Sequence, residues 1–323
     1  MVSQAAIAGP LFPKVVVTIP PLVPYTDAIL GSAGDAESLL RPGQDPHSFA
    51  LAPSQARMLD AADIVIIPDL DMSPFLKRVL ASKPKLQVIE LSKLPGAEPL
   101  PYAKDNPWIA AVKKAGGDKP EAAPTASKPV AVEKAPAIPV NDPHLWLDPE
   151  RMAAIAAPLA AAIADHAPEM RPTLSANAAT LSAHLRGEVI PALREILQPR
   201  ERNIGVYSKP EIAFITYHAA YQYFLTRFGI AHQGEIMSRP EDYIGAKTLD
   251  TLLTTAKSIR LRCIIGEQST PLVERIATYS GAKIILLSPE QNVTRAQVDA
   301  LDWIHNDYDR LLYKTAKSFG ECL

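Results

Sequence analysis

Short runs of β-branched and other aliphatic residues alternate with longer helical stretches along most of this chain. In the first half, strand-like runs lie at 15–19, 64–67 and 87–91, and helical stretches at 53–61 and 73–81 separate them. Alternation of this kind is typical of α/β folds with mainly parallel sheets. The chain is therefore expected to fold as an α/β protein.

The alternation restarts in the second half. Strand-like runs lie at 203–207, 214–216, 259–266 and 283–287, and helical stretches lie at 218–227, 249–256, 271–279 and 298–318. A chain of 323 residues exceeds what one hydrophobic core usually supports. We therefore predict two α/β halves, each with its own sheet.

The region between the two halves is predominantly helical. One alanine-rich helix is predicted at 151–166, and a second runs from Pro168 to Leu197 with apolar residues close to helical spacing. Pro191 should kink this second helix or mark a break near its end, because proline removes a backbone N–H. A helix of this length is a candidate for a rigid connector between the halves.

The segment from 101 to 140 differs in composition from the rest of the chain. It contains seven prolines, six lysines and much alanine, with little periodicity after Val112. Such a composition buries too little apolar surface to offset the entropy of ordering it. We predict a flexible loop at about 103–140.

Composition and charge exclude several classes of partner. The chain is 47% hydrophobic and 21% charged, with a net charge of −2, which favours neither nucleic acid nor a membrane surface. The first residues, 1–13, lack the basic start and apolar core of a secretory signal. Residues 5–9 are mostly small, as is common near the start of a mature exported protein, and a removed signal peptide with an added Met1 would explain this.

The chain contains 2 cysteines, Cys263 in a strand-like run and Cys322 next to the C-terminus. Two reduced thiols in a cytosolic protein are one interpretation. The other is a disulfide between the C-terminal helix and the sheet, which would stabilise the fold by about 4 kcal/mol in the chain-entropy model. A disulfide would also indicate an oxidising compartment.

The tripeptide Asp-Pro-His occurs twice, at 45–47 and 142–144, although the chain has only 7 histidines. Each copy is followed two places on by an aromatic residue, Phe49 or Trp146. Imidazole is a common metal ligand, and the preceding proline stiffens the backbone that carries it. The repeat therefore indicates one metal site assembled from two parts of the fold.

Simpler interpretations of these histidines stay open. His47 could be an ordinary loop histidine, and His144 could be a capping or core histidine beside Trp146. If His144 binds a metal, Asp142 or Asp148 could orient its ring by accepting the second N–H, as carboxylates commonly do at metal sites.

The two motifs, at 43–49 and 142–149, and the segment His-Ala-Ala-Tyr-Gln-Tyr-Phe at 218–224 together resemble a known family. They are similar to the cluster A-I substrate-binding proteins of ABC metal importers, and most of all to the zinc-binding ZnuA type. Manganese-binding proteins and adhesins are more distant members. The resemblance runs from about Lys14 to the C-terminus.

The resemblance implies two Rossmann-like α/β lobes joined by one long bridging helix, with the metal in the cleft between them. The N-terminal lobe would span 14–166, the bridging helix 168–197 and the C-terminal lobe 200–323. The family carries its third ligand on the histidine that opens the aromatic helix, here His218. The implied ligands are therefore His47 and His144 from one lobe and His218 from the other. A disulfide between Cys263 and Cys322 is also implied, as in some zinc-binding members.

The chain departs from the family pattern in two places. A carboxylate, usually Asp, supplies a fourth ligand after the last strand, but Ser288 occupies that position here. A serine hydroxyl is a poor zinc ligand, so the fourth position could be taken by a water, by Glu290 or by another nearby carboxylate. The second departure is the loop at 103–140, which lacks the histidines that zinc-binding members often carry there.

Other polar residues receive secondary interpretations. Glu267 follows a predicted strand, so it should face the crevice between the lobes, either in a hydrogen bond between lobes or as a ligand. The remaining histidines are interpreted as structural, solvated or surface residues. They are His166, His184, His232 and His305.

The resemblance implies a periplasmic, high-affinity Zn²⁺ receptor that delivers its metal to an inner-membrane ABC permease. We expect a monomer that binds no nucleic acid, and a metallochaperone is a further partner that the sequence leaves open. Three nitrogen ligands favour zinc over manganese. The alternatives are a manganese or other divalent-metal receptor or adhesin of the same fold, or a zinc hydrolase with Glu290 or Glu267 as base. The sequence contains no His-Glu-x-x-His motif and no phosphate loop, so we predict no enzyme activity.

Overall fold

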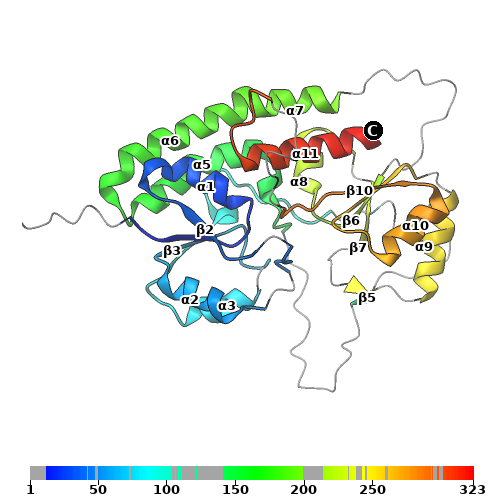
Figure 1. The fold of residues 1–323 in the computed structure, drawn as a ribbon, viewed down its shortest axis with the longest axis horizontal. Helices are drawn as coiled ribbons and strands as arrows, with labels where there is room; N and C mark the ends of the chain where they lie inside the picture. Colours follow the sequence, from blue (N-terminus) through cyan, green and yellow to red (C-terminus); the bar gives the residue numbers. More distant parts are fainter. Residues whose placement is uncertain are drawn as a thin grey trace, which may run out of the picture.

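Two four-stranded parallel sheets, one in each lobe, organise the fold (Figure 1). The computed structural model describes residues 12–41, 43–47, 50–72, 74–103, 106, 108, 110, 121–122, 141–198, 214–231, 233–237, 242–243, 246–258, 261–291, 293, 297 and 301–323. Within these residues no helix is both long enough and apolar enough to cross a membrane.

The N-terminal sheet has the strand order β2-β1-β3-β4, with all neighbours parallel. Its strands are β1 (Val15–Val17), β2 (Ala36–Ser38), β3 (Ile64–Ile67) and β4 (Gln87–Glu90), and its helices are α1 (Leu22–Leu30), α2 (Pro53–Ala61) and α3 (Pro74–Ala81). All four residues of β3 are buried, as expected for an inner strand of a parallel sheet covered on both faces. His47 lies on the loop that follows β2, beyond the carboxyl end of that strand.

The C-terminal sheet has the strand order β10-β9-β6-β7 and is also parallel. Its strands are β6 (Phe214–His218), β7 (Glu235–Met237), β9 (Cys263–Gly266) and β10 (Lys283–Leu286), and its helices are α8 (Gln222–Arg227), α9 (Ala246–Ser258) and α10 (Pro271–Ser280). His218 is the last residue of β6, and Glu267 follows β9 directly. The carboxyl ends of these parallel strands meet at one edge of the sheet, where α/β proteins usually bind ligands.

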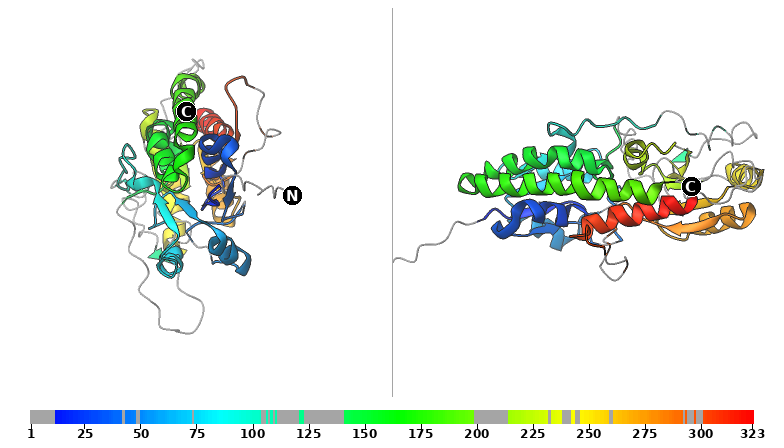
Figure 2. Two further views of the ribbon diagram at one scale, coloured as in Figure 1. Left: turned by 90° about the vertical axis from the view of Figure 1, so that its left-hand side faces the viewer. Right: turned by 90° about the horizontal axis from the view of Figure 1, so that it is seen from above.

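Long helices run along both lobes (Figure 2). They are α5 (Pro149–Ala164), α6 (Arg171–His184), the π-helical segment η5 (Leu185–Val189), α7 (Ile190–Leu197) and α11 (Asp307–Cys322). We call α6, η5 and α7 together the bridging helix. The bridging helix continues past Pro191 to Leu197. A π-helical segment that ends two residues before Pro191 marks where the missing N–H and the ring disturb the α-helical ladder.

One continuous core joins the two lobes. The largest buried cluster includes Val17 of β1, Trp146, Leu181 of the bridging helix, Phe214 of β6 and Phe319 of α11. Smaller clusters lie on the other face of each sheet. Because the lobes and the long helices share one packed core, a wide hinge opening would expose apolar surface at a cost of roughly 25 cal/mol for each Å².

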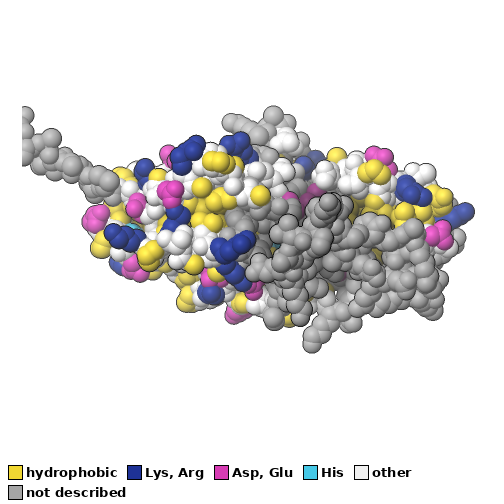
Figure 3. Space-filling view, turned by 90° about the horizontal axis from the view of Figure 1, so that it is seen from below, with side chains coloured by type: hydrophobic (Ala, Val, Ile, Leu, Met, Phe, Trp, Pro, Cys, Tyr) yellow, Lys and Arg dark blue, Asp and Glu magenta, His cyan; other side chains and the backbone are white. Residues whose placement is uncertain are grey.

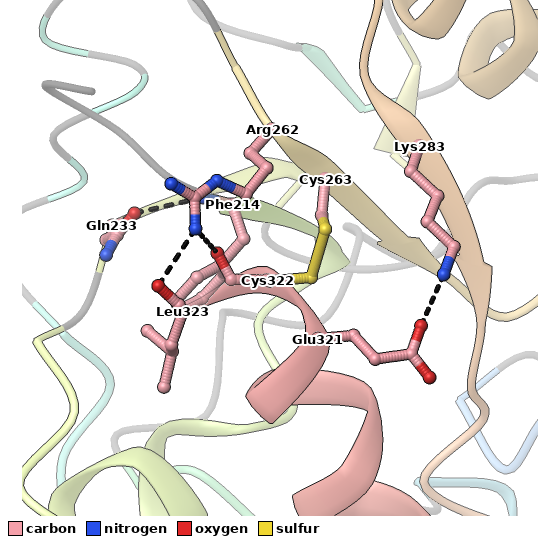
Figure 4. Close-up of a disulfide and its surroundings, with 8 residues drawn as sticks. All are labelled: Phe214, Gln233, Arg262, Cys263, Lys283, Glu321, Cys322 and Leu323. Atoms are coloured by element: carbon pink, nitrogen blue, oxygen red, sulfur yellow. Dashed lines mark hydrogen bonds and ion pairs between the residues drawn. A yellow bond between two sulfur atoms is a disulfide. The ribbon is translucent and has the colours of Figure 1, made fainter. Parts of the chain in front are cut away.

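A disulfide joins Cys263 at the start of β9 to Cys322 at the end of α11 (Figure 4), with the two Cα atoms 5.7 Å apart. Arg262 beside it donates to the backbone oxygens of Cys322 and Leu323 at 3.1 and 2.9 Å. The disulfide that the sequence resemblance implied is thus present, and it fixes α11 to the C-terminal sheet.

The structure corrects several predicted boundaries. The closing helix begins at 307 rather than 298, and residue 218 ends a strand instead of opening a helix. The elements α1, β2 and β7 were not predicted, and the predicted strand at 203–207 lies outside the described residues.

The predicted loop at 103–140 lies mostly outside the described residues, and the described part of it is anchored. Trp108 is buried in the core of the C-terminal lobe, so the prediction of a flexible segment is wrong at this end. Glycine at position 234 makes room for the Trp108 side chain, because its φ is +120° and a Cβ there would lie 2.5 Å from the Trp108 Cβ. A second anchor is β5 (Glu121–Ala122), which pairs with β8 (Asp242–Tyr243) in antiparallel fashion.

The described surface carries mixed charges. Lysine and arginine side chains are interspersed with aspartate and glutamate on the face seen in Figure 3, and neither sign forms a broad patch there.

Candidate metal site

Three histidines converge between the lobes. The ring centroids are 5.4 Å apart for His47 and His144, 5.7 Å for His47 and His218, and 5.4 Å for His144 and His218. Together with Glu290, each of these residues offers one ligand atom, and these atoms all lie within 4.8 Å of one another. We call these four residues the central cluster.

The two Asp-Pro-His copies form the same local turn. The carboxylate of Asp45 accepts from the backbone N–H of His47 at 2.8 Å, and that of Asp142 accepts from the backbone N–H of His144 at 2.9 Å. Aspartate favours such turns because its short side chain reaches the backbone two residues on. The intervening proline fixes its own φ, so each turn presents its histidine on a stiff backbone.

The second copy also orients its imidazole. His144 and Asp142 are both buried, and His144 Nδ1 lies 2.7 Å from Asp142 Oδ1. With Nδ1 donating to the carboxylate, Nε2 is left as the acceptor nitrogen on the side of the central cluster, and it lies 3.8 Å from Glu290 Oε1. Such a carboxylate behind the ring is the usual outer partner of a metal-binding histidine.

Of the two carboxylates proposed to orient His144, Asp142 does so and Asp148 does not. Asp148 caps α5 through the backbone N–H groups of Glu150 and Arg151. Its two carboxylate oxygens also accept from Arg227 of α8, at 2.7 and 3.0 Å. Asp148 therefore joins the lobes.

His218 is held from behind by Glu267. Its ring Nδ1 pairs with Glu267 Oε1, and its buried Nε2 makes no hydrogen bond among the described residues. In each of the two buried histidines, one ring nitrogen thus contacts a carboxylate, that of Asp142 for His144 and that of Glu267 for His218. The other ring nitrogen is left for another partner. Glu267 and His218 both belong to the C-terminal lobe, so the ion pair between them is not the hydrogen bond between lobes that the sequence suggested for Glu267.

Ser288 stands where the sequence resemblance places the usual carboxylate ligand. Its side chain instead holds the carboxylate of Glu290, two residues further on. Its hydroxyl bonds Glu290 Oε2 at 3.1 Å and accepts from the Glu290 backbone N–H at 3.3 Å. Trp146 Nε1 donates to the backbone oxygen of Pro289 at 2.9 Å, which fixes this loop against the motif that carries His144. Glu290 is buried, and its Oε1 makes no hydrogen bond among the described residues.

Burial and neighbouring charges set the protonation of the metal-free cluster. Burial lowers the pKa of His144 well below its ordinary value, and the charge of His218 lowers it further. Burial acts on His218 in the same direction, but the attraction of Glu267 outweighs it and raises the pKa of His218 to about 9. Burial raises the pKa of Glu290 to about 8, helped by the charge of Glu267, and burial also raises the pKa of Asp142 to about 8. A cation at the centre would displace protons from His218 and Glu290, the two cluster residues whose pKa values are raised.

A hydrogen bond between the lobes fixes the backbone near the cluster. The Tyr223 hydroxyl of α8 donates to the Asp142 backbone oxygen at 2.9 Å and accepts from the Leu100 N–H at 2.9 Å. Tyr223 and Asp142 are 81 residues apart, and Arg227 and Asp148 are 79 apart. No local sequence pattern connects partners so distant, so sequence reasoning missed both pairs.

The other histidines lie in different settings. His166 is exposed at the end of α5, and His232 lies outside the described residues. His184 and His305, both interpreted from the sequence as background, lie together, with ring centroids 4.1 Å apart. None of the three that the structure describes belongs to the central cluster.

The donor set determines which metals the cluster could hold. Three imidazole nitrogens and one carboxylate oxygen make up a four-coordinate N/O set, which zinc commonly takes. Manganese prefers more oxygen ligands, whereas copper, nickel and cobalt also accept imidazole.

Comparison with known proteins places the chain in a family. Residues 15–321 match the ZnuA family model, described as zinc-uptake complex component A, periplasmic. The high-affinity zinc uptake system protein ZnuA of Yersinia pestis is 30% identical over 262 residues, which cover 78% of this chain and 74% of the relative. Its counterpart in Brucella abortus is 27% identical over 323 residues, with 96% and 91% covered. The zinc-binding protein AdcA of Streptococcus pyogenes is 24% identical over 89% of this chain, which spans about half, 52%, of that relative's length.

Solved structures show the same fold. A crystal structure of ZnuA superposes with a TM-score of 0.69 at 22% identity, covering 97% of this chain and 99% of the other. The substrate-binding protein FpvC of P. aeruginosa, in complex with Ni²⁺, gives a TM-score of 0.67 at 17% identity, with 97% of each chain covered. The family match extends over nearly the whole chain, and this protein therefore belongs to the ZnuA family of periplasmic components of zinc-uptake complexes.

Proposed function

We propose that this protein is a periplasmic receptor that binds one Zn²⁺ with high affinity and delivers it to an ABC permease in the inner membrane. The proposed ligands are His47, His144, His218 and Glu290. The observation that carries the proposal is the convergence of these three imidazoles and one carboxylate from two lobes. The names of the relatives support zinc as the ion and uptake as the process. We expect the receptor to act as a monomer.

The donor set also argues for a receptor rather than an enzyme. Catalytic zinc sites keep a position open for water, whereas structural and storage sites are closed by four protein ligands. Glu290 Oε1, 3.8 Å from His144 Nε2, is well placed to close the site. A closed site supports binding and release of the ion and leaves no position for a nucleophilic water.

The exposure of the ligands suggests how the ion enters. His47 is partly exposed on its loop, whereas His144 and His218 are buried. We infer that Zn²⁺ first meets His47 and then exchanges its waters for the buried ligands. The shared core opposes a large movement of the lobes, so loop movement around His47 is the expected route of release.

Metal titration of the demetallated protein tests this assignment. Wild-type protein should bind one Zn²⁺ tightly in competition with a chromophoric chelator. Mutating a residue that only hydrogen-bonds to a metal ligand typically weakens metal binding by roughly 10- to 100-fold. Removing a ligand itself should weaken zinc binding by more than this, in His144→Ala, His218→Ala and His47→Ala alike. Glu290→Gln should weaken it less than any histidine variant, because the amide oxygen still offers a neutral ligand.

Matched controls separate the ligands from the fold. His166→Ala removes an exposed histidine in the turn that follows α5 and should leave zinc affinity unchanged. Circular dichroism of every variant checks that it folds. Unchanged affinity in His144→Ala and His218→Ala would overturn the ligand assignment, and a higher affinity for Mn²⁺ than for Zn²⁺ would overturn the choice of ion.

A further inference from the structure

A second cluster of histidines and carboxylates lies where the bridging helix meets the beginning of α11. His184 ends α6, and His305 precedes α11, which starts alongside the bridging helix (Figure 2). These two residues and Asp309 offer ligand atoms that lie within 4.8 Å of one another. None of them belongs to the central cluster.

His184 has the arrangement of a metal ligand with an outer carboxylate. It is buried, and its Nε2 lies 3.1 Å from Oδ2 of the fully buried Asp309. Its other nitrogen, Nδ1, is buried and makes no hydrogen bond among the described residues. The geometry repeats that of Asp142 and His144 in the central cluster, with the two ring nitrogens exchanged.

A second carboxylate faces both imidazoles. Glu188 Oε2 lies 3.5 Å from His184 Nδ1 and 3.8 Å from His305 Nε2. Ligand atoms on a tetrahedral zinc lie about 3.3 Å apart, given bonds of roughly 2.0–2.1 Å. The rings of His184 and His305 are stacked only 16° from parallel, so their nitrogens do not converge as they lie. The side chains of Glu188 and His305 are 52% and 53% exposed, and both must turn to bind one ion together with His184.

We propose that His184, Glu188 and His305 form a second binding site for a divalent transition-metal ion, with Asp309 fixing the His184 ring. Two imidazoles and one carboxylate suit Zn²⁺, Ni²⁺, Co²⁺ or Cu²⁺ better than Mg²⁺ or Ca²⁺. Exposure of two of the three ligands makes this site weaker and faster to exchange than the central cluster.

The alternative of a hydrogen-bonded helix cap accounts for only part of this arrangement. Asp309 does cap α11, since its Oδ2 accepts from the backbone N–H groups of His305 and Asn306 at 2.8 and 3.3 Å. A cap requires neither Glu188 nor a second imidazole stacked on His184. The π-helical turn that carries Glu188 is a feature frequently found at functional sites.

Occupancy of this site would add a metal link between two elements that the contact of His184 Nε2 with Asp309 Oδ2 already joins. Glu188 belongs to the π-helical turn, and His305 to the segment leading into α11, whose other end is held by the disulfide. An ion bound only by the folded protein stabilises it by mass action. Metal above one equivalent should therefore raise the melting temperature.

The test is the number of Zn²⁺ ions bound per chain. Full-length protein is dialysed to equilibrium against micromolar to millimolar ZnCl₂, and bound metal is measured by elemental analysis. We expect two ions for wild type and for the control His166→Ala. We expect one ion, at unchanged affinity, for His305→Ala and for Glu188→Gln, whose substituted side chains are exposed and should not disturb folding.

A second readout guards against binding elsewhere on the surface. Nitrogen-15 NMR of the histidine rings should show His184 and His305 shifting with the second equivalent of Zn²⁺, while the rings of the central cluster shift with the first. Saturation of wild type at one ion would overturn the proposal. A second ion bound equally well by His305→Ala and Glu188→Gln would also overturn it.

Discussion

The two Asp-Pro-His copies form the same turn but lie in different surroundings. In the first, Asp45 and His47 are partly exposed on a loop beyond β2. In the second, Asp142 and His144 are buried, and the aspartate binds both the backbone and the imidazole of its histidine. The same local motif therefore leaves one histidine ring partly exposed and buries the other in the core. The turn thus supplies a stiff backbone in both copies, whereas tertiary packing decides how tightly each ring is held.

The largest expected difference between the copies is in the histidines themselves. His144→Ala should cost more zinc affinity than His47→Ala, because it removes a pre-oriented ligand and also leaves the Asp142 carboxylate buried without its imidazole partner. An unsatisfied buried group costs about 1–3 kcal/mol, more when charged. His144→Ala should therefore also lower the free energy of unfolding, measured by urea denaturation, while His47→Ala should barely change it. Equal losses of zinc affinity and of stability in the two variants would show that burial of the second copy makes no difference.

The buried side of the cluster should also carry the pH dependence of binding. The pKa of His218 is raised to about 9 and that of Glu290 to about 8, so both hold protons at neutral pH that Zn²⁺ must displace. Affinity should therefore rise with pH up to these values and fall as pH decreases. With about two protons released, the fall should approach 100-fold for each unit below pH 8.

Titration calorimetry in buffers of different ionisation enthalpy measures the number of protons released. Glu290→Gln should lower that number by about one, because the amide cannot bind a proton at these pH values. Binding that is independent of pH between 6 and 8 would contradict the protonation assigned to the buried ligands.

Replacing the two aspartates should give the next largest difference. Asp142→Asn removes the charged acceptor behind His144 and should weaken zinc binding by about 10- to 100-fold. Asp45→Asn keeps an oxygen that can accept from the His47 backbone N–H, so the turn should persist and affinity should fall less. The two variants are compared by chelator competition at one pH. A larger loss of zinc affinity in Asp45→Asn than in Asp142→Asn would show that zinc binding depends more on the aspartate of the partly exposed copy.

The smallest effects are expected from the prolines of the two turns. Pro46→Ala and Pro143→Ala should each lower stability by about 0.4–1 kcal/mol, because alanine makes the unfolded chain more flexible. Only Pro46→Ala should also weaken zinc binding by a few-fold, since packing holds the second turn in place without its proline. Thermal unfolding and metal titration measure the two effects separately.

The sequence predicted the α/β class and the three histidines better than it predicted element boundaries. The repeat and its resemblance to a family identified His47, His144 and His218, which the fold brings together. By contrast, α1 begins after two prolines and contains Pro24, and β2 is Ala-Glu-Ser, which has little β propensity. In both cases tertiary packing overrides local preference. The division into lobes at 166 and 200 stays a prediction, because one continuous core crosses it.

The fourth position of the site illustrates what sequence alone leaves open. Ser288 suggested a missing ligand, and water, Glu290 or another carboxylate remained as candidates. The choice depends on how the loop after β10 folds, and the bond from Trp146 to Pro289 that fixes it joins residues 143 positions apart. Similarly, His184 and His305 had no recognisable motif, because they meet only when α11 packs along the bridging helix.

Zinc K-edge X-ray absorption spectroscopy of the protein loaded with one equivalent of Zn²⁺ shows directly which groups bind the ion. We expect four N/O neighbours at about 2.0–2.1 Å, with the multiple scattering of three imidazoles in wild type and of two in His144→Ala. An ion bound by one imidazole or none in wild type, or a spectrum unchanged by His144→Ala, would contradict the claim that both copies of the motif bind the same ion.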